Sequence, residues 1–111
     1  MIFSGTSPDG EKHIDKIFKG LKTQTRRKNS TYYVGHTYAV QAKRTAKADP
    51  RGRILIRAKW YELRMQGRII HSDAIKEGGY TPDQYEQLYE AMYPGWNGRW
   101  TYEFEVVQCQ S

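Results

Sequence analysis

The sequence is poor in cysteine and in long apolar stretches, and both features limit what the protein can be. Its 111 residues include one cysteine, Cys109, so no disulfide can form within the chain. That is typical of a reducing compartment. No stretch reaches the ~18–20 apolar residues that a membrane-spanning helix needs. Met1–Gly10 also lacks the apolar core of a signal peptide. We therefore expect a cytoplasmic protein without membrane contact.

The sequence offers no pattern for a metal or cofactor. His13, His36 and His71 stand far apart, and none lies near the cysteine at the spacing of a metal site. The length suits one hydrophobic core, because independent domains usually have about 100–150 residues. We expect a single domain over residues 1–111, with no metal and no cofactor.

Charge is distributed unevenly along the chain. Residues 1–70 hold 16 Lys and Arg against 5 Asp and Glu, whereas residues 71–111 hold 2 against 7. One interpretation is a cationic face that attracts the phosphates of RNA; the other is that the charge only maintains solubility. The first interpretation predicts that six cations line one side of a cleft: Arg26, Arg27, Lys28, Arg44, Arg53 and Arg57.

The first third of the chain contains a predicted helix. Ser7–Asp9 has the residue types that begin a helix, and Gly20 is typical of a helix end. Between them, apolar residues recur at helical spacing: Ile14, Ile17, Phe18 and Leu21.

Alternating apolar residues predict strands before and after this region. Met1–Ser4 and Thr37–Ala42 are short candidates, a longer strand begins at Arg53, and Trp100–Val106 has the clearest alternation. We expect six strand residues to face one core together with Ile14, Ile17 and Phe18: Ile54, Ile56, Trp60, Trp100, Tyr102 and Phe104.

Two helices are predicted before the last strand. Ser72 begins a short helix that ends near Glu77, and Thr81 begins a second with Gln84 placed for a capping box. The buried side of the second helix would comprise Tyr85, Leu88, Tyr89 and Met92. Trp96 follows in a glycine-rich turn and is the best candidate for an exposed residue that stacks on a base. The element order predicts an α+β domain with a mainly antiparallel sheet.

Four blocks of the sequence resemble the ASCH family. Lys19–Arg27 is similar to the family's signature, in which a helix ends at Gly and is followed by Lys-Thr-x-Thr and Arg. Gly35–Gln41, Gly52–Ile54 and Ala74–Gly79 are similar to later blocks, in the same order. The resemblance implies a PUA-like β-barrel with a first helix and a two-helix insert before the last strand. It also implies an RNA-linked role.

Some small bacterial ASCH proteins are amidohydrolases that deacetylate acetylcytidine, and the resemblance carries their catalytic positions onto this chain. Lys22 would be the base, Thr25 the nucleophile and Glu77 the third member. The nearby cations Arg26 and Arg27 would lower the pKa of Lys22. Lys22 and Thr25 can share a face only if the chain turns between Gly20 and Thr25, because residues three apart point to opposite faces of a strand.

The residues themselves leave simpler interpretations open. Lys22 could be a solvated residue at a helix end, Thr25 an ordinary strand residue, and Glu77 an exposed residue near a helix end. Three functions therefore remain: an RNA- or nucleoside-binding domain with a basic cleft, an amidohydrolase acting on a modified cytidine, and a ribonuclease.

Overall fold

A computed structural model describes residues 1–107 of the chain, so Cys109 lies outside the described residues. The elements follow in the order α1 (His13–Phe18), β1 (Gln24–Arg27), β2 (Thr37–Ala39), β3 (Arg53–Leu63), a short 3-10 helix (Arg64–Gln66), α2 (His71–Lys76), α3 (Pro82–Met92) and β4 (Gly98–Val107). The predicted α+β class, with a first helix and two helices before the last strand, is confirmed.

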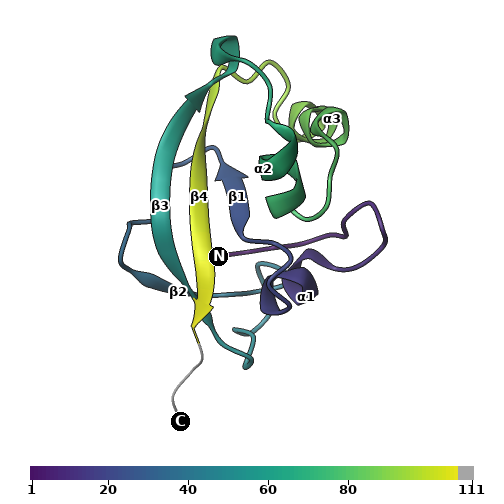
Figure 1. Ribbon diagram of the computed structural model, residues 1–111. Helices are drawn as coiled ribbons and strands as arrows, with labels where there is room; N and C mark the ends of the chain where they lie inside the picture. Colours follow the sequence, from purple (N-terminus) through teal and green to yellow (C-terminus); the bar gives the residue numbers. More distant parts are fainter. Residues whose placement is uncertain (108–111) are drawn as a thin grey trace.

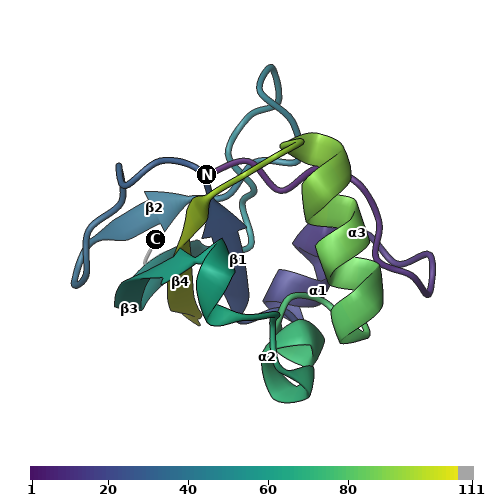
Figure 2. The ribbon, with the colours of Figure 1, turned by 90° about the horizontal axis from the view of Figure 1, so that it is seen from above.

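The four strands form one antiparallel sheet in the order β1-β4-β3-β2 (Figure 1). The long strands β3 and β4 make its centre, and β1 lies at one edge beside the helices (Figure 2). Within residues 1–107 this sheet stays open, so the expected closed barrel is not formed. Met1–Ser4 is not a full strand, because Ile2 makes only an isolated parallel bridge to Gln41.

Side chains in the first half of β4 are buried on both faces of the strand, where Arg99 and Thr101 alternate with Trp100 and Tyr102. Tyr102 and Phe104 belong to a core with Ile14 and Ile17 of α1. On the other face, Arg99 packs against the rings of the α3 cluster, including Trp96 at 4.3 Å. Burial of these apolar surfaces holds α1 on one side of β4 and α3 on the other.

Most of the predicted core is confirmed. Ile54, Ile56, Tyr102 and Phe104 are buried, and Phe18 and Trp100 pack against them while partly exposed. Trp60 is the exception. The register of β3 against β4 shifts between Ile56 and Ala58, so Arg57 is an extra residue and Trp60 lies opposite Thr101 rather than opposite Trp100. A β-bulge of this kind reverses the alternation of every later residue in the strand.

The helix boundaries differ from the predicted ones in two places. α1 begins at His13, because Ser7–Asp9 forms a turn in which Ser7 Oγ donates a hydrogen bond to Asp9 Oδ1. α2 begins at His71, with Ile70 rather than Ser72 as its N-cap. Among residues 1–107, no helix combines the length and the apolar character needed to cross a membrane.

α3 forms as the sequence predicts at its start and differs at its end. Thr81 Oγ1 accepts a hydrogen bond from the Gln84 backbone, and the Gln84 side chain accepts one from the Thr81 backbone. Tyr85 and Tyr89 are buried and Leu88 is partly buried, but Met92 is 52% exposed. The buried side of α3 therefore stops short of its last residue.

The capping box of α3 gives a direct test of this local structure. Thr81→Ala removes the side-chain acceptor at the N-cap, so we expect a loss of about 1 kcal/mol in the free energy of unfolding, measured by urea denaturation. Thr45→Ala, at an exposed position in a turn, serves as the control and should change stability little. Equal stabilities of the two variants would contradict the capping role.

Candidate functional site

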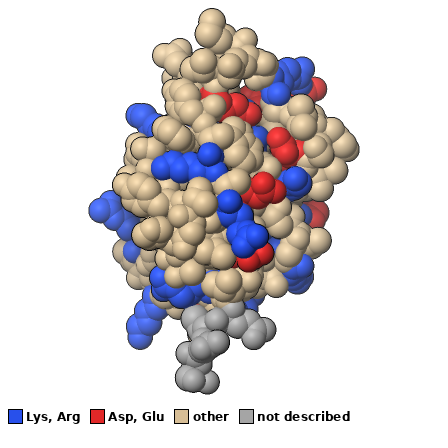
Figure 3. Space-filling view, turned by 60° about the vertical axis from the view of Figure 1, so that its left-hand side comes forward, with Lys and Arg blue, Asp and Glu red and all other residues tan. Residues whose placement is uncertain are grey.

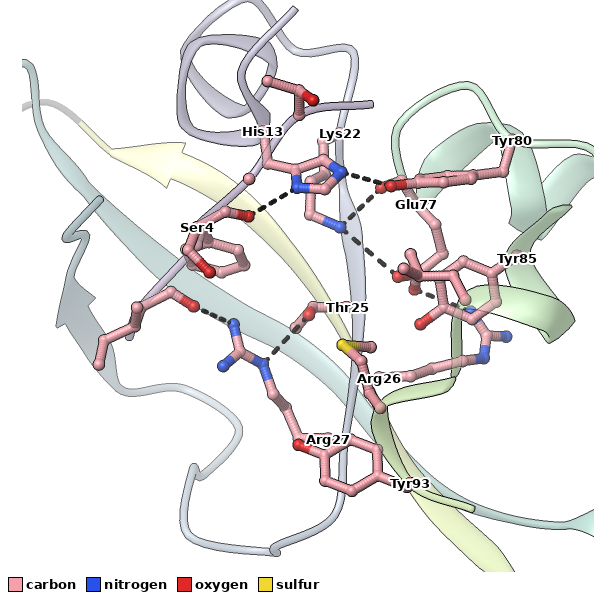
Figure 4. Close-up of a pocket in the computed structure, with 16 residues that line it drawn as sticks. Ser4, His13, Lys22, Thr25, Arg26, Arg27, Glu77, Tyr80, Tyr85 and Tyr93 are labelled. Atoms are coloured by element: carbon pink, nitrogen blue, oxygen red, sulfur yellow. Dashed lines mark hydrogen bonds and ion pairs between the residues drawn. The ribbon is translucent and has the colours of Figure 1, made fainter. Parts of the chain in front are cut away.

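A cavity of about 320 Å³ opens between Ile2–Thr6, β1, and the α2–α3 region. Its wall includes the three residues that the family resemblance singled out, Lys22, Thr25 and Glu77 (Figure 4). The cavity also contains Arg26, Arg27, His13 and several aromatic rings. Residues 55 positions apart in the sequence meet here, because Lys22 contacts Glu77 directly.

Lys22 reaches the cavity because the chain turns sharply after α1. Gly20 has a φ of +75°, which favours glycine, and the backbone N–H groups of Leu21 and Lys22 both donate to Lys16 O. The Lys22 side chain is buried, and its Nζ donates to Gln24 O at 2.9 Å and to Glu77 O at 2.7 Å. Burial lowers the pKa of Lys22; the Glu77 charge opposes this, and Arg27 adds to it.

Glu77 ends α2 and is 1% exposed. Its Oε2 accepts a hydrogen bond from Arg26 Nη1 at 2.8 Å, and its Oε1 lies 3.5 Å from Lys22 Nζ. The next residues, Gly78 and Gly79, have φ values of 135° and 87°. These conformations suit glycine, and they turn the chain so that the carbonyl of Glu77 also faces Lys22.

Thr25 lies in β1 and is 5% exposed. Its Oγ1 accepts a hydrogen bond from Arg27 Nε at 3.2 Å. None of the hydrogen bonds among residues 1–107 joins Thr25 to Lys22. The two side chains share the cavity, but the hydrogen bond that the amidohydrolase hypothesis predicts is not formed in this structure.

Arg27 contacts the Thr25 hydroxyl directly. Its Nη2 donates to Ile2 O at 2.6 Å, and its guanidinium lies 4.8 Å from the centre of the Phe3 ring. These contacts hold the group at the cavity wall (Figure 4). A fixed guanidinium at this place can stabilise negative charge that develops on an oxygen beside Thr25.

Arg26 does not lie on a cationic face, which corrects the prediction for this residue. Its side chain is fully buried and pairs with Glu62 at 2.8 Å, with Glu77 at 2.8 Å and with Asp73 at 3.6 Å. Glu62 also accepts from Arg99 Nε at 2.9 Å, and Arg99 pairs with Glu86. Buried charges are stable only when they are paired, and here a chain of ion pairs crosses the interior.

The other predicted RNA contacts are not gathered around the cavity. Of the six cations, only Arg26 and Arg27 line it. Arg53 bonds Thr37 and Arg57 pairs with Glu105 on the sheet, and Lys28 and Arg44 are exposed elsewhere. In Figure 3 the Lys and Arg side chains are spread over the visible face, with acidic side chains among them. Within residues 1–107, the six cations therefore do not line one cleft.

Trp96 is also placed differently from the prediction. It is 8% exposed and packs edge-on against Tyr89, with the guanidinium groups of Arg99 and Arg64 over its ring. The turn that holds Trp96 folds back onto α3, so the ring packs in the α3 cluster and is not the exposed residue that the sequence predicted.

Several cavity residues carried no signal in the sequence. His13 and Tyr80 contact each other in the cavity wall, and Phe3 and Tyr85 contribute apolar surface to it. Tyr85 was predicted on the buried side of its helix, but no spacing in the sequence places it or the other three residues at a site, so only the folded chain identifies them. No group of three or more His, Cys, Asp or Glu in residues 1–107 is placed to hold a metal ion.

The open antiparallel sheet with three helices resembles solved structures of ASCH domains. The ASCH domain from Lactobacillus crispatus JV V101 superposes with a TM-score of 0.71 at 14% identity, covering 97% of this chain and 80% of the other. A protein from Enterococcus faecalis V583 gives a TM-score of 0.65 at 18% identity, covering 99% and 80%.

ASCH from Zymomonas mobilis gives a TM-score of 0.62 at 16% identity, covering 96% of this chain and 68% of the other. No family model and no curated protein matches the sequence. At such low sequence identity, the structural similarity shows a shared fold and nothing more. We conclude that this chain has the ASCH fold.

The buried ion pairs predict unequal effects of two similar substitutions. Arg26→Met leaves the buried Glu77 carboxylate with only the more distant Lys22 and removes one of the two cations that pair with Glu62, so we expect a loss of about 3–5 kcal/mol in unfolding free energy. Arg57→Met breaks only the exposed pair with Glu105 and should cost less than about 1 kcal/mol. Denaturant unfolding measures both, and equal losses would contradict the structural role of Arg26.

Proposed function

We propose that this protein is an amidohydrolase that removes a small acyl group from the exocyclic amine of a modified cytidine. The observation that carries the proposal is the meeting of Lys22, Thr25 and Glu77 at one cavity. Surface residues have no reason to converge and be buried in this way, and buried titratable groups in a cavity are typical of catalytic sites.

The hydrogen bonds of Lys22 suit a neutral amine. A neutral amine has two N–H groups and one lone pair, and two backbone carbonyls accept from Nζ at 2.9 and 2.7 Å. Both N–H groups are then used, and the lone pair remains to accept a proton. The third possible partner, Glu77 Oε1, is more distant at 3.5 Å and can hold the third proton of the ammonium once it forms.

The proposed reaction uses Thr25 as the nucleophile. On substrate binding, Lys22 approaches Thr25, since catalytic hydrogen bonds are often long without ligand. Lys22 takes the Thr25 proton, Thr25 Oγ1 bonds to the acyl carbon, and Arg27 stabilises the oxyanion. The C–N bond breaks as Lys22 returns the proton to the amine. Water then attacks the acyl ester with Lys22 again as base, which releases the carboxylic acid and Thr25.

The size and walls of the cavity support a nucleoside rather than a polymer. A volume of about 320 Å³ is at the lower end of small-molecule sites. Phe3 and Tyr85 offer ring surfaces for a pyrimidine. The scattering of the exposed cations gives little support to binding of long RNA through a single basic cleft.

The proposal is tested by acetate release from acetylcytidine. We expect Thr25→Ala to lower kcat at least about a thousandfold, because the nucleophile is lost. The fold should persist, since removing one small polar group rarely costs more than about 1–2 kcal/mol. Thr23→Ala, two residues earlier and outside this cavity, should keep full activity.

The same preparations should be incubated with labelled RNA. Cleavage of RNA without acetate release would favour the ribonuclease alternative. Salt-dependent binding of RNA without either reaction would favour a binding domain. Full activity of Thr25→Ala on acetylcytidine would exclude Thr25 as the nucleophile.

The depressed pKa of Lys22 predicts the pH dependence of the reaction. Only neutral Lys22 accepts the Thr25 proton, so kcat/KM should rise with pH and level off below the pKa of an exposed lysine. Arg27 lowers the pKa of Lys22, so Arg27→Met should move the midpoint to higher pH, whatever it does to the maximal rate. The distant Arg57→Met should leave the midpoint unchanged. A profile without this rise would exclude Lys22 as the base.

A further inference from the structure

A histidine–tyrosine pair forms part of the cavity wall beside the proposed catalytic residues. His13 at the start of α1 and Tyr80 after the Gly78-Gly79 turn lie 67 residues apart, and His13 Nε2 is 2.6 Å from Tyr80 Oη. His13 Nδ1 is 2.9 Å from Ser4 O. Figure 4 draws the Tyr80 hydroxyl pointing toward His13, and both Tyr80 and Lys22 line the cavity.

The partners of His13 determine where its proton lies. A backbone carbonyl can only accept, so Nδ1 carries the hydrogen and donates to Ser4 O. Burial lowers the pKa of His13, which favours the neutral ring, and its Nε2 is then an acceptor. Tyr80 must therefore donate its hydroxyl proton to His13.

Tyr80 has no second proton to offer. Burial and the charge of Glu77 raise the pKa of Tyr80 to about 12, so the phenol stays protonated near neutral pH. Its one hydrogen is held by His13 Nε2 at 2.6 Å. The Tyr80 oxygen consequently presents only lone pairs to the cavity, and it can bind a ligand group only if that group donates.

We infer that Tyr80 Oη is the acceptor that recognises an N–H of the ligand, and that His13 fixes this polarity. The inference rests on the proposed function and names its substrate class. The site takes secondary amides, whose nitrogen keeps one N–H, and the amine products formed from them. It discriminates against tertiary amides and against rings that present a carbonyl at the same position.

Binding of unreactive nucleosides tests the inference without relying on catalysis. Cytidine carries an exocyclic N–H₂ group, and N4,N4-dimethylcytidine carries none. By calorimetry we expect the unsubstituted protein to bind cytidine about tenfold or more tightly than the dimethyl compound. This ratio corresponds to the loss of one hydrogen bond that leaves a buried group unsatisfied. Tyr80→Phe should lose this preference by weakening cytidine binding. A steric effect of the methyl groups would instead persist in Tyr80→Phe.

Two further variants separate recognition from a merely structural contact. His13→Phe frees the Tyr80 hydroxyl to donate into the cavity, so the ratio of affinities for cytidine and uridine should shift toward uridine by about tenfold. Tyr33→Phe, at a 59% exposed tyrosine outside the cavity, should change neither ratio. If Tyr80 only connected α1 to the α2–α3 turn, Tyr80→Phe would lower the affinities for all of these ligands by the same factor.

The outcomes also distinguish this inference from the proposed function. Preference for cytidine that depends on Tyr80, without acetate release by any preparation, supports the inference and overturns the hydrolase proposal. Acetate release with equal turnover of secondary and tertiary acetylated cytidines supports the hydrolase and overturns the inference. No binding of cytidine, or a preference that survives in Tyr80→Phe, also overturns the inference.

Discussion

Glu77 connects the two buried cations on which the cavity depends. Its carboxylate accepts from Arg26 at 2.8 Å and faces Lys22 at 3.5 Å, while its backbone carbonyl accepts from Lys22 at 2.7 Å. Neither cation could remain buried without such partners, because an unpaired charge inside a protein costs several kcal/mol. The placement of β1 against α2 is therefore coupled to the charge state of the cavity, and a change at Glu77 would affect both.

The uneven charge along the sequence has a structural explanation in these contacts. Cations from the first part of the chain pair with carboxylates from the last part, as Arg26 does with Glu77 and Arg64 does with Glu90. Folding brings the basic and acidic segments together instead of separating them into two faces. A charge count along the chain cannot anticipate this, because it depends on which segments become neighbours.

The sequence predicts local features well and long-range ones poorly. The capping box at Thr81 and the alternation around Phe104 depend on neighbouring residues, and both form as expected. The face of the sheet on which Trp60 lies depends on one extra residue, Arg57, in the pairing of β3 with β4. No local pattern encodes this extra residue. Lys22, Thr25 and Glu77 came from family resemblance, because their types and spacing alone suggest no site. The contact of His13 with Tyr80 required the folded chain.

Two buried basic side chains in the cavity, Lys22 and Arg26, differ in the groups that they contact. Lys22 and Arg26 are both buried cations near Glu77, yet Lys22 is held mainly by uncharged carbonyls and Arg26 by carboxylates. Burial lowers the pKa of Lys22 although Glu77 Oε1 lies 3.5 Å away, whereas a guanidinium keeps its charge in any protein environment. Lys22 is therefore suited to exchange a proton, and Arg26 to fix the carboxylate beside it. This difference follows from the chemistry of the two side chains: an amine can lose its proton in a buried site, and a guanidinium cannot. Exchanging Lys22 and Arg26 would therefore remove the group that can exchange a proton from its place beside Thr25 in the cavity.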